Sequence, residues 1–243
     1  MGDRFTTTQW SRVQQAKEGS DTKARQALED LCQIYWHPLY AFIRRQGYDP
    51  EAAQDLTQAY FTELLAKDFL QVVDPSAGRF RSFLLASLKH FLSHERDRAR
   101  ALKRGGGTRS ISLDVETAEK RLGNEAADHL TPEHVFELQW AWTVLERSLE
   151  RLRQAALSSG GADQFERLQP YLTDEGTQAP YREVASQLEM TESAVRTAVH
   201  RLRKSFGGML RAEIAETVAD PADVDDEIRH LLAIIQPGHG PPK

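Results

Sequence analysis

The chain contains one cysteine, Cys32, among its 243 residues, so no disulfide can form within it. A single thiol is usual in a reducing compartment. The sequence also lacks an uncharged apolar run long enough to cross a bilayer, and its first ten residues lack the apolar segment of a signal peptide. We therefore expect a cytoplasmic protein that does not bind a membrane.

Motifs that carry catalysis are missing as well. The sequence has no glycine-rich phosphate loop, no metalloprotease HExxH and no nucleophile elbow. His90 and His94 stand one helical turn apart, but no third metal ligand accompanies them. We therefore predict no enzymatic activity, no catalytic residues, no cofactor and no metal site.

The charge balance limits the partners that the chain can have. Its 31 Lys and Arg residues against 36 Asp and Glu residues give a formal net charge of −5. An acidic chain is unsuited to coating nucleic acid without specificity. Any contact with DNA must therefore come from local basic patches.

Long alternation of apolar and polar residues, which is typical of strands, is also absent. Apolar residues recur instead at three and four positions, and Gly and Pro cluster between the periodic segments. This pattern predicts an all-α fold. Asp49-Pro50 and Thr131-Pro132 have the capping residue and first-turn proline of helix starts, and a break is predicted near Pro38.

Gly105-Gly106-Gly107 marks the clearest boundary in the chain, and the polar segment that follows has no apolar period. We interpret that segment as a flexible linker between two small helical domains, the second of which ends in a helix-turn-helix. The predicted parts are an N-terminal segment 1–21, a first domain 22–104, the linker 105–130, a second domain 131–211 and an acidic extension 212–243.

The tract Tyr181–Lys204 has the pattern of two short helices joined by a turn at Glu189-Met190. Thr191 is suited to cap the second helix, whose apolar positions recur at three and four residues. Short polar and basic side chains lie off that stripe and could reach base edges and phosphates; a hairpin with a solvated basic face is the alternative. The predicted DNA-binding residues of this tract are Thr191, Ser193, Arg196, Thr197, His200, Arg201, Arg203 and Lys204.

A second candidate surface lies on a basic, aromatic-rich helix predicted over 79–104. Basic side chains interleaved with aromatic rings suit a single DNA strand, because charges follow the backbone while rings stack on bases. A core helix with a solvated basic end accounts for the same pattern. The candidate residues for contact with a melted strand are Phe80, Arg81, Phe83, Lys89, Arg96, Arg98 and Arg100.

Taken together, three stretches resemble the extracytoplasmic-function group of bacterial RNA polymerase sigma factors. GYDPEAAQDLTQAYFTELL (Gly47–Leu65) looks like the clamp-docking helix of the second sigma region. Asp74–Arg100 looks like the promoter-melting helix, and Tyr181–Lys204 looks like the upstream-element reader of the fourth region. The resemblance covers most of Thr22–Arg104 and Val144–Arg211.

The resemblance implies a mechanism without an active site. The protein would bind core RNA polymerase and promoter DNA and direct promoter-specific transcription initiation. Its first domain would hold a flipped-out base, since a pocket and nearby cations can offset an unstacking cost of a few kcal/mol. The residues that it assigns to polymerase binding are Asp55, Leu56, Gln58 and Phe61.

The clamp-docking stretch carries fewer acids than the family pattern, with Ala52-Ala53-Gln54-Asp55 and then Ala59 in their place. A phosphate on Thr57 would add a charge of about −1.5 to −2. We therefore hypothesise a phosphorylation switch at Thr57, with a packed or solvated threonine as the alternative. The sequence leaves open whether a kinase, an anti-sigma factor or the extension 212–243 regulates polymerase binding.

Two other classes of protein account for part of the pattern. A helix-turn-helix transcriptional regulator that acts without polymerase needs only the second domain. An all-helical adaptor needs neither DNA-facing helix. Asp74–Arg100 distinguishes these classes from a sigma factor, because neither has a use for a strand-melting helix.

Overall fold

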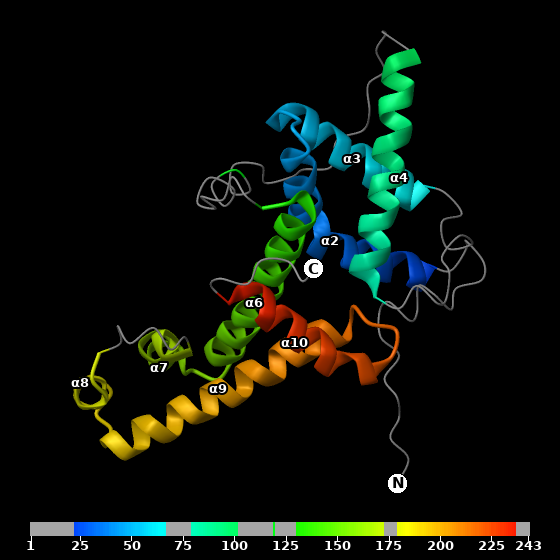
Figure 1. Cartoon of the computed structure of the whole chain (residues 1–243). Coiled ribbons are helices and arrows are strands. Elements are labelled where there is room, and N and C mark those ends of the chain that lie inside the picture. Colours follow the sequence, from blue (N-terminus) through cyan, green and yellow to red (C-terminus); the bar gives the residue numbers. More distant parts are fainter. Residues whose placement is uncertain (1–21, 67–78, 102–118, 120–129, 173–178, 237–243) are drawn as a thin grey trace. The chain divides into compact units, whose positions relative to one another are not determined.

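The computed structural model describes residues 22–66, 79–101, 119, 130–172 and 179–236. Within these residues the regular structure is helical, apart from one antiparallel bridge between Arg79 and Val218, and the prediction of an all-α chain is confirmed at this level. The elements (Figure 1) are α2 (Thr22–Arg45), α3 (Pro50–Ala66), α4 (Phe80–Ala101), α6 (Pro132–Ser158), α7 (Ala162–Leu168), η2 (Gln169–Leu172), α8 (Tyr181–Gln187), α9 (Glu192–Ala215), η3 (Pro221–Asp223) and α10 (Val224–Ile235).

The chain divides into two compact units. Unit 1 consists of Met1–Thr143 and Ile214–Lys243, and unit 2 of Val144–Glu213. The division falls inside α6 and inside α9, whereas the sequence-based division falls at the linker 105–130. Apart from Glu119 and Leu130, that linker lies outside the described residues, as does the segment 1–21.

The helix starts expected from the sequence are confirmed. Asp49 caps α3, because its Oδ1 accepts a hydrogen bond of 2.8 Å from the Ala52 amide. Thr131 caps α6 in the same way, with 3.2 Å between its Oγ1 and the amide nitrogen of His134. Both side chains satisfy backbone donors that the first turn of a helix leaves without a partner.

The predicted break at Pro38 is wrong, because α2 continues through this residue to Arg45. A proline inside a helix removes a backbone donor and costs about 3 kcal/mol. The residues that follow Pro38 in the chain, Leu39 to Ile43, are each at most 2 % exposed. Burying a single large apolar side chain contributes about 1.5–3 kcal/mol, so the packing of this stretch outweighs the cost of the proline.

Aromatic rings join four helices in the core of unit 1. Tyr35 of α2 meets Phe80 of α4 edge-on, with 5.1 Å between ring centroids, and stacks against Phe136 of α6 at 6.4 Å. A second contact, between Tyr60 of α3 and Phe91 of α4, has a centroid distance of 5.5 Å. All five rings are buried, which fixes the start of α4 deep in the unit.

A buried ion cluster lies beside these rings. Arg81 of α4, 4 % exposed, donates from Nε and Nη2 to the two carboxylate oxygens of Glu227 at 2.8 and 3.2 Å. Arg79 pairs with the same Glu227 at 2.6 Å, and Nη1 of Arg81 donates to Glu137. His230 Nε2 lies 3.1 Å from the Glu137 carboxylate. The cluster therefore connects α4, α6 and α10.

Arg81 keeps its charge in this setting. Burial alone would lower the pKa of its guanidinium, but hydrogen bonding to Glu227 and the charge of Glu137 outweigh burial and raise that pKa. The Arg81 Cζ also lies 4.9 Å from the ring centroid of Trp140, a cation–π distance. The guanidinium is thus compensated by two carboxylates and one indole.

The backbone reinforces the same junction. The Phe80 amide donates to the Thr217 carbonyl at 3.1 Å, next to the bridge between Arg79 and Val218. Helix α10 buries Leu231 and Ile234. Residues from the predicted extension 212–243 are therefore part of the core of unit 1.

Two adjacent arginines of α2 hold residues of the predicted linker. Arg44 donates from Nε and Nη2 to the Glu119 carboxylate at 2.6 and 3.0 Å, and the Tyr40 hydroxyl donates to it at 2.6 Å. Arg45 Nε donates to the Leu130 carbonyl at 3.0 Å. Hydrogen bonding from Arg44 holds the pKa of Glu119 below its ordinary value, so this contact is present at neutral pH and is lost as the pH falls through the lowered pKa.

The buried ion cluster leads to a test of stability. We expect Glu227→Gln to lower the free energy of unfolding by about 3–5 kcal/mol, because it leaves the buried Arg81 without its principal counter-charge. Asp226→Asn, which removes an equal charge from an exposed pair with Arg229, is the control and is expected to cost less than about 0.5 kcal/mol. Urea denaturation measures both; equal small losses would show that the cluster contributes little.

Candidate nucleic-acid interface

Helices α8 and α9 are joined by a short, well-defined turn. The Met190 amide bonds to the Ala185 carbonyl at 2.9 Å and Glu189 has a φ of 52°, which together form the common helix end with one left-handed residue. Thr191 then caps α9, since its Oγ1 lies 3.2 Å from the Ala194 amide nitrogen, as the sequence predicts. The turn is therefore fixed by a backbone hydrogen bond at the end of α8 and by a side-chain cap at the start of α9.

A small apolar cluster holds the two helices in place. Val195 and Val199 of α9 are buried with Val184 and Ala185 of α8 and with Leu168 of α7. Elsewhere in unit 2, the Glu213 carboxylate, 2 % exposed, pairs with Arg151 at 2.6 Å and with Arg147 at 3.5 Å. Unit 2 thus has its own core, which supports α9 along one side.

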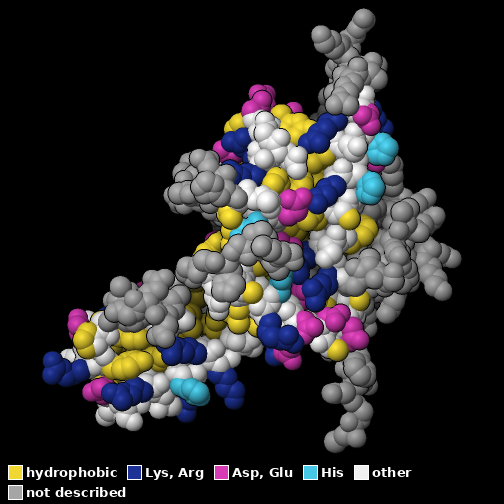
Figure 2. Space-filling view, viewed as in Figure 1, with side chains coloured by type: hydrophobic (Ala, Val, Ile, Leu, Met, Phe, Trp, Pro, Cys, Tyr) yellow, Lys and Arg dark blue, Asp and Glu magenta, His cyan; other side chains and the backbone are white. Residues whose placement is uncertain are grey.

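The opposite side of α9 is polar and exposed. At 100° per residue, the side chains at 193, 196, 197, 200 and 204 fall within a sector of about 100°. All eight residues predicted to bind DNA in this tract are exposed. In Figure 2, dark-blue Lys and Arg side chains gather along the α8–α9 end of unit 2. From Thr191 to Lys204 the charged residues are Glu192, Arg196, Arg201, Arg203 and Lys204, which sum to +3 with His200 neutral.

Arg196 lies on this exposed surface and has two partners. Its Nη2 donates to the Glu192 carboxylate at 2.6 Å, and its Cζ lies 5.5 Å from the ring centroid of Tyr181. Tyr181 stacks on Tyr171, with 5.0 Å between centroids and 15° between ring planes. The guanidinium is therefore held in one region although its side chain is 64 % exposed.

Arg203 has a structural contact that the sequence did not reveal. Its Nε donates to the Tyr171 carbonyl at 2.8 Å, which ties α9 to η2. Lys204, the next residue, is exposed on the outward sector of α9. Of these two neighbours, Lys204 is the better placed to bind a phosphate.

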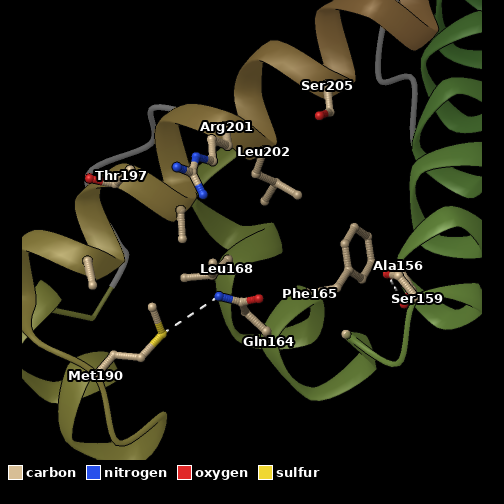
Figure 3. Close-up of a pocket in the computed structure, with 13 residues that line it drawn as sticks. Ala156, Ser159, Gln164, Phe165, Leu168, Met190, Thr197, Arg201, Leu202 and Ser205 are labelled. Carbon is tan, nitrogen blue, oxygen red and sulfur yellow. Dashed lines mark hydrogen bonds between the residues drawn. The ribbon is translucent and has the colours of Figure 1, made fainter.

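An open groove of about 570 Å³ runs between α7 and α9. Thr197 and Arg201 lie on its α9 wall, with Gln164 and Phe165 on α7 opposite them (Figure 3). The Gln164 amide nitrogen lies 3.7 Å from the Met190 sulfur. Two of the predicted DNA-binding residues, Thr197 and Arg201, thus border the groove beside the exposed face of α9.

The candidate strand-binding residues at the start of α4 are largely inaccessible. Phe80 is 0 % and Arg81 is 4 % exposed, both within the core of unit 1, and Phe83 is half-buried. In this conformation Phe80 and Arg81 present no surface to a DNA strand. Their side chains instead pack against Tyr35 and pair with Glu227, respectively.

The basic residues Lys89, Arg96 and Arg98 further along α4 are exposed, and each forms an ion pair or a hydrogen bond with a neighbouring side chain. Lys89 pairs with Glu133 at 2.7 Å, and Arg98 pairs with Glu95 at 2.8 Å. Arg96 donates to the Tyr48 hydroxyl at 3.1 Å and also to Gln46. Arg100 belongs to α4, and its side chain lies outside the described part of the structure.

The residues assigned to polymerase binding divide by exposure. Asp55 is exposed and Leu56 is half-buried on α3, whereas Gln58 and Phe61 are 7 % and 2 % exposed. Thr57 is fully buried, and its hydroxyl donates to the Ala53 carbonyl at 2.7 Å. A kinase cannot reach such a hydroxyl, so this conformation favours the packed threonine over the phosphorylation switch.

Two properties of the described residues bear on other functions. No group of three His, Cys, Asp or Glu residues among them lies close enough to hold a metal ion, and His90 and His94 are both exposed on α4. No helix in the same residues combines the length and apolar character needed to cross a bilayer.

Sequence reasoning missed the partners of the key cations. Tyr181 and Glu192 lie in the tract that the sequence singled out, but neither is among the residues predicted there to bind DNA. The spacing of 192 and 196 was the available signal for their ion pair, because residues four apart face each other on a helix. No local signal links Arg81 to Glu227, which are 146 residues apart.

Comparisons with protein-family models, curated proteins and solved structures give no match to this chain. The chemistry of the α9 surface is therefore the guide to what it binds. Guanidinium, ammonium, hydroxyl and imidazole groups are donors for phosphate oxygens and base edges.

Arg203 and Lys204 are expected to differ in their contribution to the stability of unit 2. Arg203→Ala is expected to lower the free energy of unfolding of unit 2 by about 1 kcal/mol, because it removes the hydrogen bond to the Tyr171 carbonyl. Lys204→Ala is the matched control and is expected to change it by less than about 0.5 kcal/mol. Thermal denaturation of both variants decides the matter, and an equal loss of stability would argue against a structural role for Arg203.

Proposed function

We propose that this chain is a sigma factor of the extracytoplasmic-function type, which binds core RNA polymerase in the cytoplasm and directs promoter-specific transcription initiation. The observation that carries the proposal is the exposed polar and basic face of α9, which follows a short helix and a capped turn. A helix presented in this way fits the major groove of DNA. The resemblance of Gly47–Leu65 and Asp74–Arg100 to the second sigma region supports the polymerase partner.

In the proposed complex, the first turns of α9 approach the base edges of the upstream element. Ser193 and Arg196 are exposed there, and a guanidinium can bond to O6 and N7 of guanine together. Lys204, further along the outward face, is placed for a phosphate. Thr191 keeps its hydroxyl at the helix cap, so its contribution is to fix the start of the reading helix.

The melted strand is assigned to the exposed part of α4. Lys89, Arg96 and Arg98 are solvent-accessible and can exchange their present partners for phosphates. Exposed ion pairs contribute about 0–1 kcal/mol, so this exchange has a low cost. Phe83 is half-buried and stacks on Phe80, with 6.3 Å between ring centroids, and it is the less buried of the two candidate rings.

Polymerase binding is assigned to the exposed side of α3. Asp55 offers a carboxylate and Leu56 an apolar contact on that side. The buried Gln58 and Phe61 support the helix from within. Between Ala52 and Ala59 Asp55 is the one acid, and it is exposed, which favours a modest affinity for the polymerase clamp.

The second candidate is a helix-turn-helix transcriptional regulator that acts without polymerase. The burial of Phe80 and Arg81 favours it, because these residues were expected to contact the melted strand and are inaccessible. This function needs the same α9 surface and makes no use of α3 or α4 in binding.

Transcription in vitro separates the two candidates. Added to core polymerase, the protein is expected to yield discrete run-off transcripts from a subset of genomic promoter fragments. Gel shifts with and without core polymerase provide the comparison, since a regulator binds the same DNA whether or not polymerase is present. Normal binding to core polymerase without a specific transcript from any template would refute the sigma-factor proposal.

Base reading by α9 has its own test. Arg196→Ala is expected to cost about 1–3 kcal/mol on the preferred duplex and to relax selectivity at one base pair. Lys204→Ala is expected to weaken binding to all sequences alike and to reduce the salt dependence by about one phosphate contact. Fluorescence anisotropy over a series of salt concentrations measures both, and identical sequence-independent losses would remove Arg196 from base reading.

A further inference from the structure

The first turns of α9 contain a charge pair where an excess of positive charge would be expected. Glu192 occupies the first position of the helix, and its Oε1 lies 2.6 Å from Arg196 Nη2. Both side chains are open to solvent, at 46 % and 64 % exposure. The pair has no net charge, so it adds little to the general attraction between this surface and phosphates.

An unpaired arginine at this point would bind phosphate readily. Phosphate contacts provide sequence-independent affinity, and each one steepens the dependence on salt. A nearby carboxylate opposes such a contact, because it repels the phosphate and already accepts a hydrogen bond from the guanidinium. A guanidinium has five N–H donors, and only one of them bonds to Glu192, so one two-donor edge remains for the two acceptors of a guanine.

The Tyr181 ring restricts the same guanidinium from another side. The Arg196 Cζ lies 5.5 Å from its centroid, within the range of a cation–π contact. Tyr181 cannot swing freely, because it stacks on Tyr171 with ring planes 15° apart. Tyr171 is itself 5 % exposed and donates its hydroxyl hydrogen to the Ala179 carbonyl. The orientation of Arg196 thus depends on a ring that is anchored in the core of unit 2.

From these contacts we infer that Glu192 and Tyr181 are positioning residues that reserve Arg196 for reading a base. Glu192 disfavours phosphate as a ligand of the guanidinium, and Tyr181 limits the directions in which the guanidinium can point. The two residues therefore raise the ratio of specific to nonspecific DNA affinity without contacting a base themselves. This inference rests on the proposed DNA-binding function and deepens it.

The test uses the full chain and two duplexes of equal length. The preferred duplex is selected from a random library with the wild-type protein, and the second duplex has a shuffled sequence. Glu192→Gln is expected to bind the shuffled duplex more tightly and to steepen the salt dependence by about one phosphate contact. It is also expected to narrow the ratio of the two affinities by about two- to fivefold, the range of one exposed ionic contact.

Two controls separate this effect from a general change of charge. Glu150→Gln removes an equal charge from the Glu150–Arg153 pair on α6 and is expected to leave the affinity ratio unchanged. In an Arg196→Ala background, Glu192→Gln is expected to have no effect on the salt dependence, because the guanidinium that it releases is absent. Persistence of the full effect in that background would overturn the role of Glu192.

The positioning role of Tyr181 is tested with two substitutions of its ring. Tyr181→Leu is expected to narrow the affinity ratio by about two- to fivefold through loss of the cation–π contact, while Tyr181→Phe keeps the ring and retains the wild-type ratio. Thermal denaturation of both variants shows whether the fold is intact. An unchanged ratio in folded Tyr181→Leu would overturn the role of Tyr181.

The outcomes also distinguish this inference from the function on which it rests. If the wild-type selection enriches no sequence at any salt concentration, both the proposed DNA reading and the present inference are wrong. If it enriches a sequence and the Glu192 and Tyr181 variants keep the wild-type ratio and salt dependence, only the positioning role is wrong.

Discussion

The pairing of Arg81 with Glu227 inside unit 1 is the interaction on which the arrangement of that unit depends. A buried charge without a partner is so costly that Arg81 can occupy the core only with carboxylates beside it. Glu227 and Glu137 supply them from α10 and α6, and both oxygens of Glu227 are engaged. The start of α4 therefore takes its place together with two helices that lie far along the chain. Its neighbour Phe80 is sealed into the core by the same arrangement.

Local signals predicted the helices well and the long-range contacts poorly. Caps at Asp49, Thr131 and Thr191 follow from short-range chemistry, and each makes its expected hydrogen bond. The sequence makes Arg81 a candidate for contact with a melted strand, because a basic residue on a basic helix carries no sign of a partner 146 residues away. Pro38 was read as a break because propensity ignores the packing that can outweigh it. Tertiary context decided both cases.

The candidate site on α9 could be predicted from the sequence because it, too, depends on local signals. A recognition helix is formed by one continuous stretch of sequence, so its buried stripe and its exposed face can both be predicted from that stretch. What the tract could not show is how each cation is used. Arg203 donates to the Tyr171 carbonyl and Arg201 borders a groove, while Arg196 and Lys204 face outward. These four cations look equivalent in the sequence, yet they differ in their neighbours and therefore in their chemistry.

The composition of unit 1 from two separated stretches has a consequence for synthesis on the ribosome. Chains emerge at about 5–20 residues per second, so the 146 residues between Arg81 and Glu227 correspond to roughly 7–30 s of translation. During that interval Arg81 has no Glu227 to pair with, and α4 cannot adopt its final packing. Unit 2 is continuous in the chain and can complete its own core first. The core of unit 2 can therefore be complete before that of unit 1, although unit 1 begins earlier in the chain.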